Sequence, residues 1–441
     1  MTRRIVPYFI LKVIHWFRRD LRLEDNSALA AATKSGADVV PVFIFDKDIL
    51  EKLEDRDDSR VSFIHDTLIR LKEQLQELGS DLRVYHGSVE KCWKQITEEW
   101  QPSEVYTNED YEPYARKRDD AVNDLLAEKG IAFRLFKDNV VFHKDEVVKD
   151  NGGPYTVYTP YRRKWMSLFT QELIEEKQVD LDRTARMEPK TMLTLEDMGF
   201  VHSEIEIPSP DTSESLLRDY AKNRDLPAVS GTSHISTHLR FGTTSIRACY
   251  RKVWNMSETW VGELIWRSFF SQLLYHFPHV VDVEFKPKYK HIPWRNDPSE
   301  FEKWTEGRTG IPIVDAGMRE LAQSGFMHNR VRMICASFLT KNLLIDWRWG
   351  EAWFARKLTD YDLASNNGNW QWAAGCGADA APYFRVFNPE TQREKFDPQW
   401  EYVKKWVPEF GTWEYPRPMV DLKATRKRCI ETFKQALDQA P

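Results

Sequence analysis

The sequence predicts an α/β N-terminal domain, built on a doubly wound parallel sheet, followed by a larger all-α domain. Two patterns predict this division. Short apolar segments alternate with amphipathic helices over the first third of the chain, which is typical of a parallel sheet with helices on both faces. After Ser213 this alternation stops and helical periodicity dominates. We therefore expect an α/β domain over residues 1–140, a connector over 141–210 and a helical domain over 211–441.

The predicted strands are short, mainly apolar segments separated by turns. Continuous apolar runs of this length are typical of strands buried on both faces. They lie at Val13 to Phe17, Val39 to Phe45, Leu82 to Tyr85, Glu104 to Thr107 and Phe133 to Phe136. The helices predicted between them span Asn26 to Ser35, Ser59 to Leu78, Val89 to Trp100 and Arg116 to Glu128.

The α/β domain lacks the glycine-rich motifs that bind nucleotide phosphates. It contains neither GxGxxG nor GxxxxGK[ST]. A dense run of charges follows the first predicted strand, and we interpret it as a salt-bridged surface turn. Its members are Arg18, Arg19, Asp20, Arg22, Glu24 and Asp25.

The connector contains several glycines and prolines, which indicate turns and loops. Within it we expect one helix, Pro160 to Glu176. The helical domain shows repeated amphipathic segments. Its predicted helices span Glu258 to Phe277, Ile313 to Ser324, Arg330 to Asp346, Gly350 to Leu358 and Lys423 to Leu437.

Composition excludes several classes of protein. The chain has 41% hydrophobic and 30% charged residues, and no apolar run approaches the roughly 20 residues of a membrane helix. Residues 1–12 lack the features of a signal peptide and predict a tail before the first strand. The five cysteines are scattered without a CxxC pair, which excludes a zinc site and a disulfide framework and predicts a reducing cytoplasm.

Tryptophan is unusually frequent, with 17 residues, most of them after Trp254. A large aromatic core explains this count, and composition alone favours that explanation. Stacking platforms or electron carriers are the functional alternative.

Three local patterns combine groups that suit a heterocyclic or phosphorylated ligand. Gly231-Thr-Ser-His-Ile-Ser236 places hydroxyls and free backbone N–H groups at a helix start, as a phosphate cradle or an ordinary N-cap. Glu263, Trp266 and Arg267 share one helix face. They could bind a flat heterocycle, or they could form an ion pair beside a core tryptophan. Asn329 and Met333 share another face.

The stretch from Asp360 to Trp372 carries two aspartates, several asparagines and two tryptophans. Paired carboxylates suit acid–base work or a hard cation. No histidine or cysteine joins them at ligand spacing, so we expect no transition metal.

Over most of its length the chain resembles the photolyase/cryptochrome family, most closely class I photolyases of cyclobutane pyrimidine dimers. The order and spacing of several segments carry the resemblance. These are WFRRDLRLEDN (16–26), ELIWRSFF (263–270), TGIPIVDAGMREL (309–321), MHNRVRM (327–333), LLIDW (343–347), the Asp360 to Trp372 stretch and DAAPYFRVFNP (379–389).

The resemblance implies that FAD binds in the helical domain. Arg332 is expected to pair with Asp360 beside the flavin ring, and Asn366 to face flavin N5. Trp370, Trp347 and Trp294 match the family's electron-hopping chain. The full implied set of FAD-binding residues is Tyr220, Thr232, Ser233, His234, Ile235, Ser236, Trp260, Glu263, Arg267, Arg332, Asp360, Asp362 and Asn366.

The resemblance also implies UV-damaged DNA as the partner, with the lesion flipped out of the stack. The implied lesion-binding residues are Arg224, Glu263, Trp266, Asn329, Arg330, Met333, Trp372 and Arg385. Glu263 and Asn329 are the expected catalytic contacts to the dimer, together with Asn366 and the tryptophan chain on the flavin side.

The implied activity is light-driven repair of cyclobutane pyrimidine dimers by electron transfer from reduced FAD, a carbon–carbon lyase reaction of a monomer. (6-4) photolyases carry two histidines where this chain has Asn329 and Met333. A (6-4) photolyase, a cryptochrome photoreceptor and a cofactor-free base-flipping protein are the alternatives. His234 replaces the Arg or Lys of many relatives. Tyr114-Ala115 leaves a second, light-collecting chromophore open as a deazaflavin, a folate or a flavin.

Overall fold

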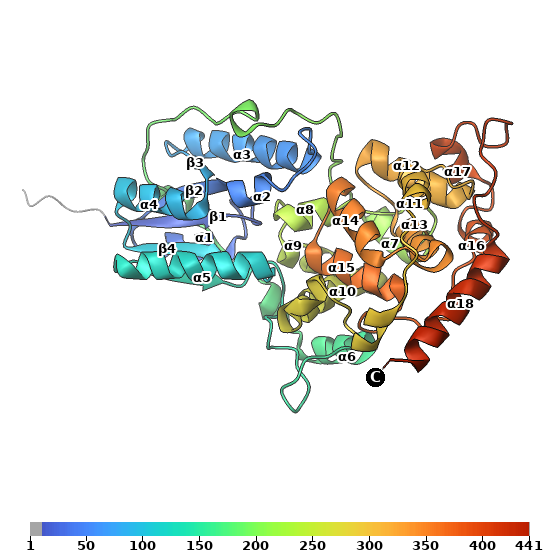
Figure 1. Cartoon of the computed structure of the whole chain (residues 1–441). Coiled ribbons are helices and arrows are strands. Elements are labelled where there is room, and N and C mark those ends of the chain that lie inside the picture. Colours follow the sequence, from blue (N-terminus) through green and yellow to red (C-terminus); the bar gives the residue numbers. More distant parts are fainter. Residues whose placement is uncertain (1–10, 441) are drawn as a thin grey trace, which may run out of the picture. The chain divides into compact units, whose positions relative to one another are not determined.

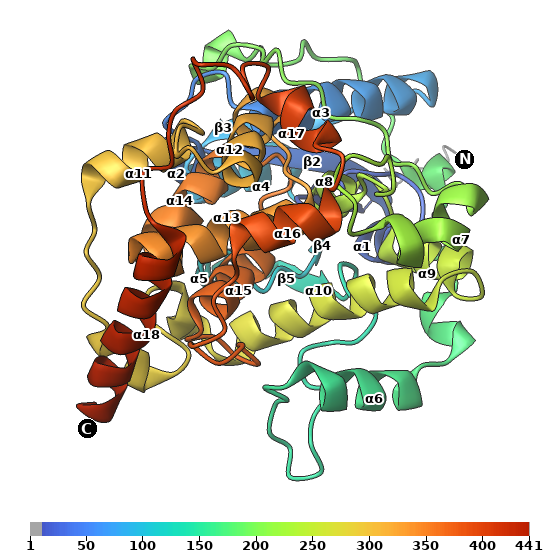
Figure 2. The ribbon, with the colours of Figure 1, turned by 90° about the vertical axis from the view of Figure 1, so that its right-hand side faces the viewer.

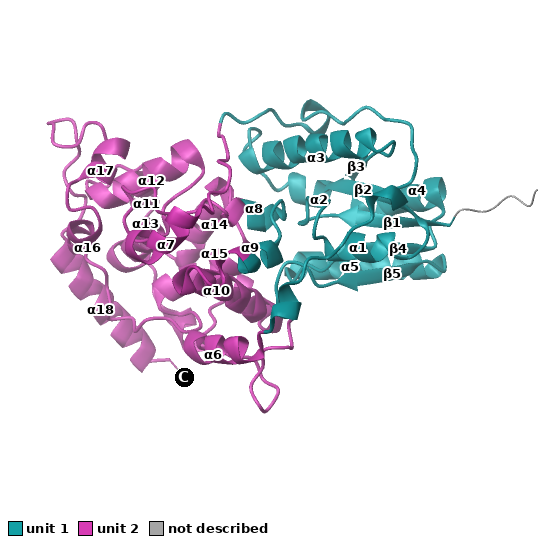
Figure 3. Ribbon diagram, turned by 180° about the vertical axis from the view of Figure 1, so that it is seen from behind, with its two compact units in different colours: residues 1–143, 170–204, 238–251 teal, residues 144–169, 205–237, 252–441 magenta. Residues whose placement is uncertain are grey.

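The computed structural model describes residues 11–440, and these form two compact units (Figure 3). Unit 1 contains the chain up to His143, Thr170–Glu204 and His238–Arg251, and the remainder forms unit 2. The expected connector, 141–210, is therefore shared between the two units, and residues 238–251 of the expected helical domain belong to unit 1. The expected tail lies almost wholly outside the described residues.

Unit 1 contains a five-stranded parallel sheet in the order β3-β2-β1-β4-β5 (Figure 1). This confirms the predicted doubly wound sheet and its strands. The strands are β1 (Lys12–Phe17), β2 (Asp38–Asp46), β3 (Arg83–Gly87), β4 (Glu104–Asn108) and β5 (Ala132–Phe136). The helices are α1 (Ser27–Thr33), α2 (Lys47–Leu50), α3 (Ser59–Glu77), α4 (Val89–Trp100) and α5 (Pro113–Glu128).

Alternate residues of the central strands face two separate cores, because successive side chains of a strand point to opposite faces. Val13 and Phe17 of β1 pack in one core with α1 and α3. Ile14 and Trp16 pack in the other core with α4 and α5. Both faces of the sheet are therefore covered, which explains why the strands read as continuous apolar runs.

The charged run after β1 is salt-bridged but buried, so the predicted surface turn was wrong. Asp20, Arg22 and Asp25 are 1%, 9% and 5% exposed. Arg22 donates to Asp138 at 2.6 Å, and Asn108 donates to Asp20 at 2.6 Å. These partners lie far away in the sequence, so the local pattern of charges gave no sign of burial.

Buried His15 predicts a pH-dependent stability of unit 1. Burial lowers the pKa of His15 to about 4, against an ordinary value of 6.5. Below pH 6.5, His15 becomes protonated in the unfolded chain but stays neutral in the folded chain until the pH approaches 4. The free energy of unfolding therefore falls as the pH falls through this window. At about 1.4 kcal/mol for each pH unit, the loss is about 3 kcal/mol. We expect His15→Leu to flatten this slope in denaturant unfolding measured from pH 7 to pH 4. An unchanged slope would contradict the assignment.

Unit 2 is helical, with α10 packed against α6, α7 and α15, and α14 packed against α15 (Figure 2). Helices α8 (Ser236–Phe241) and α9 (Ile246–Val253) cross the boundaries of the units. The longer helices of unit 2 are α6 (Tyr158–Leu168), α7 (Glu214–Asn223), α10 (Glu258–His276), α11 (Pro298–Thr305), α12 (Pro312–Ser324), α13 (Asn329–Ser337), α14 (Trp347–Lys357), α15 (Leu363–Ala374), α16 (Pro389–Phe396), α17 (Glu401–Trp406) and α18 (Leu422–Asp438).

Two predicted helices end early. Helix α6 stops at Leu168, short of the predicted Glu176. The helix predicted from Arg330 to Asp346 changes into a π-helical turn, Phe338–Leu343, and ends at Leu344 in a left-handed conformation. The Leu344 carbonyl accepts a hydrogen bond from the backbone N–H of Arg295 at 2.7 Å, so a distant segment stabilises this break.

Within residues 11–440, none of the helices combines the length and the apolar character needed to cross a membrane. The five cysteines are all buried, and none of them forms a disulfide. In the same residues no group of three or more His, Cys, Asp or Glu side chains is placed to hold a metal ion.

Candidate functional site

Helices α13, α14 and α15 surround a hollow that opens to solvent. Its walls are partly apolar and carry a few converging polar groups, as ligand sites do. Eight of the predicted site residues line it: Asn329, Arg332, Met333, Asp360, Asp362, Asn366, Trp370 and Trp372. The other lining residues are Ala336, Phe354, Leu358, Tyr361, Ser365, Asn369 and Ala373.

Arg332 and Asp360 form a two-pronged ion pair in the wall of the hollow. The two guanidinium nitrogens of Arg332 donate to the two carboxylate oxygens of Asp360 at 3.1 and 2.9 Å. Arg332 Nε donates to the Met327 carbonyl at 2.7 Å, so three of its donors are held in place. Paired donation of this kind fixes the orientation of both side chains. The pair is a rigid polar edge against which a flat ring can be positioned.

Asp362 and Asn366 act at the start of α15. Asp362 caps the helix by accepting from the Ser365 backbone N–H at 3.0 Å. Asn366 donates through Nδ2 to the Glu351 carboxylate at 2.8 Å and to the Glu351 backbone carbonyl at 3.1 Å. Burial raises the pKa of Glu351, while the hydrogen bond from Asn366 lowers it. Because Glu351 holds the amide nitrogen, the carbonyl oxygen of Asn366 is the atom offered to a ligand.

Trp370 is a buried wall of the hollow and packs closely against α14. Its ring lies edge-on to Phe354, with centroids 4.9 Å apart. A Cβ placed on Gly350 would lie 2.1 Å from the Trp370 ring and 2.6 Å from Leu339. Only a residue without a side chain allows this approach.

We expect Gly350→Ala to push Trp370 toward the hollow. The added methyl overpacks a rigid region, which costs typically about 1–3 kcal/mol. Thermal unfolding and the flavin content of the purified protein measure the effect. Exposed Ala352→Gly, on the same helix, is the matched control for helix propensity. A Gly350→Ala protein with unchanged stability and flavin content would contradict this packing argument.

A second cluster of predicted residues lies around α7, α10 and α13. Arg224 forms an ion pair with Glu263, and Arg330 donates to Asp225 at 2.9 Å. Arg224 Nε lies 4.0 Å from the same Asp225 carboxylate. Burial raises the pKa of Glu263, and the Arg224 guanidinium opposes that rise. Asp225 therefore links two cations that the sequence suggested as DNA contacts.

Trp266 presents little of its ring face. The Tyr158 ring stacks on it with centroids 3.5 Å apart and an interplanar angle of 6°. Phe270 lies 5.6 Å away at 24°. The Tyr158 hydroxyl is held by the Gly262 carbonyl at 2.9 Å, which fixes this stack. A ligand beside Trp266 would therefore contact the edge of the ring more than its face.

Trp372 belongs to two adjoining hollows. It lines the larger one described above, and it also lines a smaller one together with Arg385. Arg385 is exposed and does not line the larger hollow. Lys341, in the wall of the smaller hollow, donates to the Ala374 carbonyl at 2.7 Å and so holds the end of α15.

The remaining predicted residues lie outside the larger hollow. In the loop before α8, Ser233 and Ile235 are buried, and His234 has a left-handed φ of 48°. Trp260 and Trp347 are buried core residues, and Trp294 packs against the core with its ring 5.8 Å from Phe433. The other members of the predicted set in this part of the chain are Tyr220, Thr232, Ser236 and Arg267.

Sequence comparisons show the family to which the chain belongs. The profile of the FAD binding domain of DNA photolyase matches residues 260–414, which include the larger hollow. The DNA photolyase profile matches residues 13–179. The deoxyribodipyrimidine photo-lyase of Halobacterium salinarum is 39% identical over 96% of this chain and 99% of its own length.

Two solved structures share the fold. The class III photolyase of Agrobacterium tumefaciens is 33% identical, with a TM-score of 0.90 over 99% of this chain and 100% of that one. The archaeal photolyase of Sulfolobus tokodaii, solved with two FAD molecules, is 35% identical, with a TM-score of 0.84 over 96% and 100%. The chain belongs to the deoxyribodipyrimidine photo-lyase family, and unit 2 carries its FAD-binding domain.

Three residues in these clusters were not predicted from the sequence. Glu351 anchors Asn366, Asp225 links Arg224 to Arg330, and Tyr158 covers Trp266. Asp225 directly follows the predicted Arg224, and this adjacency was the available signal. Glu351 and Tyr158 lie on helices whose packing partners cannot be read from local periodicity.

Proposed function

We propose that this protein repairs cyclobutane pyrimidine dimers in UV-damaged DNA, using light absorbed by reduced FAD. One observation carries the proposal. Residues expected to hold the flavin (Arg332, Asp360) and residues expected to contact the lesion (Asn329, Met333) line the same hollow. A flavin and a flipped pyrimidine dimer placed there would be neighbours, which electron transfer between them requires.

The residues of the hollow fit a flavin. Phe354, Leu358 and Trp370 supply apolar walls for a fused ring, and the Arg332–Asp360 pair supplies a polar edge. Asn366 offers a carbonyl acceptor from a fixed position. FAD bound here supplies the light absorption and the electron that opens the dimer, and the protein supplies position and electrostatics.

The lesion side of the hollow would recognise a flipped pyrimidine pair. Asn329 and Met333 lie one turn apart on the same face of α13. The Asn329 amide can hydrogen-bond base edges, and the Met333 thioether lies beside it as a flexible apolar contact. Trp372 offers a ring for stacking, which is worth roughly 1–3 kcal/mol per base. Glu263, on α10, would hydrogen-bond the dimer. The Arg224 and Arg330 guanidinium groups would hold the flanking phosphates.

Repair of irradiated oligothymidine tests the function. Reduced protein is mixed with the oligonucleotide, and the ultraviolet absorbance of the thymines is followed under blue light and in the dark. We expect a rise only in the light. No rise, with FAD bound and reduced, would overturn dimer repair in favour of a photoreceptor or another lesion.

Asn329→Ala tests the lesion side. We expect a lower repair yield with FAD fully retained, because Asn329 is assigned to the lesion and not to the flavin. Asn123→Ala, on the exposed surface of α5, is the control and should repair normally. Loss of FAD from the Asn329→Ala protein would overturn this assignment.

We further propose that a second, light-collecting chromophore binds in unit 1. The strand order reverses between β1 and β4, and ligands of doubly wound sheets bind at such a point. The Sulfolobus tokodaii relative, with its two FAD molecules, supports a second chromophore. Absorption spectra of the native protein before and after extraction of its chromophores test the proposal. A single FAD per chain, with nothing else extracted, would overturn it.

The proposed working form is a monomer in a reducing, cytoplasmic compartment. The five buried cysteines, none of them in a disulfide, support this location. Size-exclusion chromatography with light scattering tests the monomer, and a stable dimer would overturn it.

A further inference from the structure

A series of aromatic rings leads from the hollow toward α11 and the outer part of α14. Trp370, in the wall of the hollow, lies 6.1 Å from Trp304 between ring centroids. Trp304 lies 5.7 Å from Phe301, and Phe301 lies 5.2 Å from Trp349. The edges of such rings are closer than their centroids. This series contains neither Trp347 nor Trp294, the other members of the expected electron-hopping chain.

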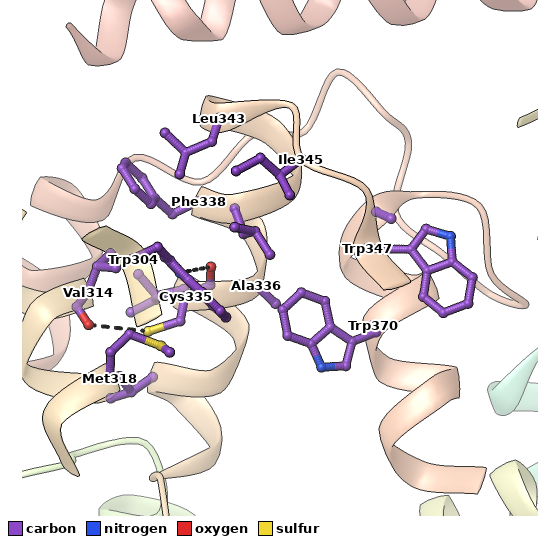
Figure 4. Close-up of a cluster of buried hydrophobic side chains, with 14 of the residues drawn as sticks. Trp304, Val314, Met318, Cys335, Ala336, Phe338, Leu343, Ile345, Trp347 and Trp370 are labelled. Carbon is purple, nitrogen blue, oxygen red and sulfur yellow. Dashed lines mark hydrogen bonds between the residues drawn. The ribbon is translucent and has the colours of Figure 1, made fainter. Parts of the chain in front are cut away.

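We propose that Trp304 and Trp349 form a second electron route between the surface and Trp370. This inference rests on the proposed function, because it requires FAD in the hollow. Figure 4 shows Trp304 on one side of the Trp370 ring and Trp347 on the other side. Trp370 is then a branch point, from which an electron vacancy can leave through Trp347 or through Trp304.

The contacts of Trp304 favour this role. The side chain is fully buried, and its ring is parallel to Phe354 at 6.1 Å and edge-on to Trp370. Its indole N–H donates to the Cys335 carbonyl at 3.3 Å, shown as a dashed line in Figure 4. A carbonyl acceptor at the N–H stabilises positive charge on the indole. The three rings Trp370, Phe354 and Trp304 thus form one rigid group next to the hollow.

Charges select the exit of the route. Trp349 and Trp353 are both half-buried and both contact Phe301, at 5.2 and 6.5 Å. Arg356 and Lys357 lie over the Trp353 ring at 5.8 and 5.6 Å from its centroid. Two cations oppose a positive charge on that ring. Trp349 is the nearer ring, and we assign the exit to it.

Light-excited, oxidised FAD takes one electron from Trp370, so the flavin is reduced and Trp370 carries a positive charge. Trp304 reduces Trp370, and Trp349 then reduces Trp304 across Phe301, which bridges the two rings without being oxidised. A soluble thiol finally gives one electron to Trp349, releases its proton to water and leaves as a thiyl radical. Positive charge is more stable where water can reach it, so the vacancy moves outward.

Photoreduction of the holoprotein, without DNA, tests the route. Oxidised protein with full FAD is illuminated with a soluble thiol present, and flavin bleaching and the transient absorbance of tryptophan radicals are recorded. We expect Trp347→Phe to keep part of the photoreduction. Trp347→Phe with Trp304→Phe should lose it, as should Trp370→Phe alone. If Trp347→Phe alone abolishes it, or if the double variant matches Trp347→Phe, the route is overturned.

The exit is tested in the Trp347→Phe background. Adding Trp349→Phe should abolish the remaining photoreduction, whereas adding Trp353→Phe should leave it unchanged. The reverse pattern would overturn the assignment of Trp349. FAD content and thermal unfolding of each variant establish that the ring exchange has not disturbed the fold, and Phe keeps a ring at each position.

Repair by chemically reduced protein separates this inference from the proposed function. Trp304→Phe should repair normally once its FAD is reduced, since the route supplies electrons only to oxidised FAD. If the unmodified protein repairs nothing, the proposed function fails. The photoreduction series still decides the route, because it needs bound FAD and no lesion.

Discussion

Asp138→Ala should destabilise unit 1 by about 3–5 kcal/mol, the usual cost of leaving a buried charge without its partner. Asp138 is 2% exposed and accepts from Arg22 at 2.6 Å and from Arg247 at 2.8 Å. It also accepts from the backbone N–H and the hydroxyl of Ser27, at 3.1 and 3.0 Å. Burial alone would raise the pKa of Asp138, but the two guanidinium groups hold it well below its usual range.

Denaturant unfolding measures the Asp138 effect. Asp120→Ala, an exposed carboxylate on α5, is the control for the loss of one negative charge. We expect that control to change stability by less than about 0.5 kcal/mol. An Asp138→Ala protein as stable as Asp120→Ala would show that the two arginines find other partners.

Arg332→Leu should remove FAD from the protein. The substitution leaves the Asp360 carboxylate, only 5% exposed, without the two donors that hold it, and breaking such a pair costs about 3 kcal/mol or more. The Asp360 side chain can then turn away or take up a proton, so the polar edge of the hollow is lost. FAD released by mild denaturation and quantified by absorbance, with thermal unfolding, measures both effects.

Arg332→Lys is the matched variant for that experiment. Lysine keeps the positive charge but cannot donate to both carboxylate oxygens from a planar fork. We expect intermediate FAD retention and a smaller loss of stability. Full FAD content in Arg332→Leu would contradict the assignment of this pair to the flavin site.

Much of the fold could be predicted because its signals are local. The strands of unit 1 are apolar on both faces, as parallel strands must be, and α1 begins after Asn26, which caps it by accepting from Leu29. The errors lie where distant residues decide. Asp25 is buried because Arg247 reaches it at 2.8 Å, and no local pattern reveals that contact.

The same distinction applies to the hollow. The Asp360 to Trp372 segment could be singled out because its polar and aromatic residues are concentrated within a few turns. Glu351 could not, since its contact with Asn366 depends on how α14 packs on α15. The break after Ser337 had no glycine or proline to indicate it. Its cause is the tertiary hydrogen bond to Leu344, and its effect is to let α14 begin at Trp347.

The chain crosses five times from one unit to the other, and this affects how the protein is made. Unit 1 needs Arg247, which bonds to Asp25 and Asp138. Until residue 251 has left the ribosome, the buried Asp25 carboxylate lacks Arg247 and Arg251, and Asp138 has only Arg22 as a cationic partner. By then more than half of the polypeptide has been synthesised. The first 140 residues expressed alone would therefore carry a buried Asp25 carboxylate without its arginines and an Asp138 paired with Arg22 alone, and would depend on chaperones or aggregate. A stable N-terminal fragment would have to include the segment 238–251 as well.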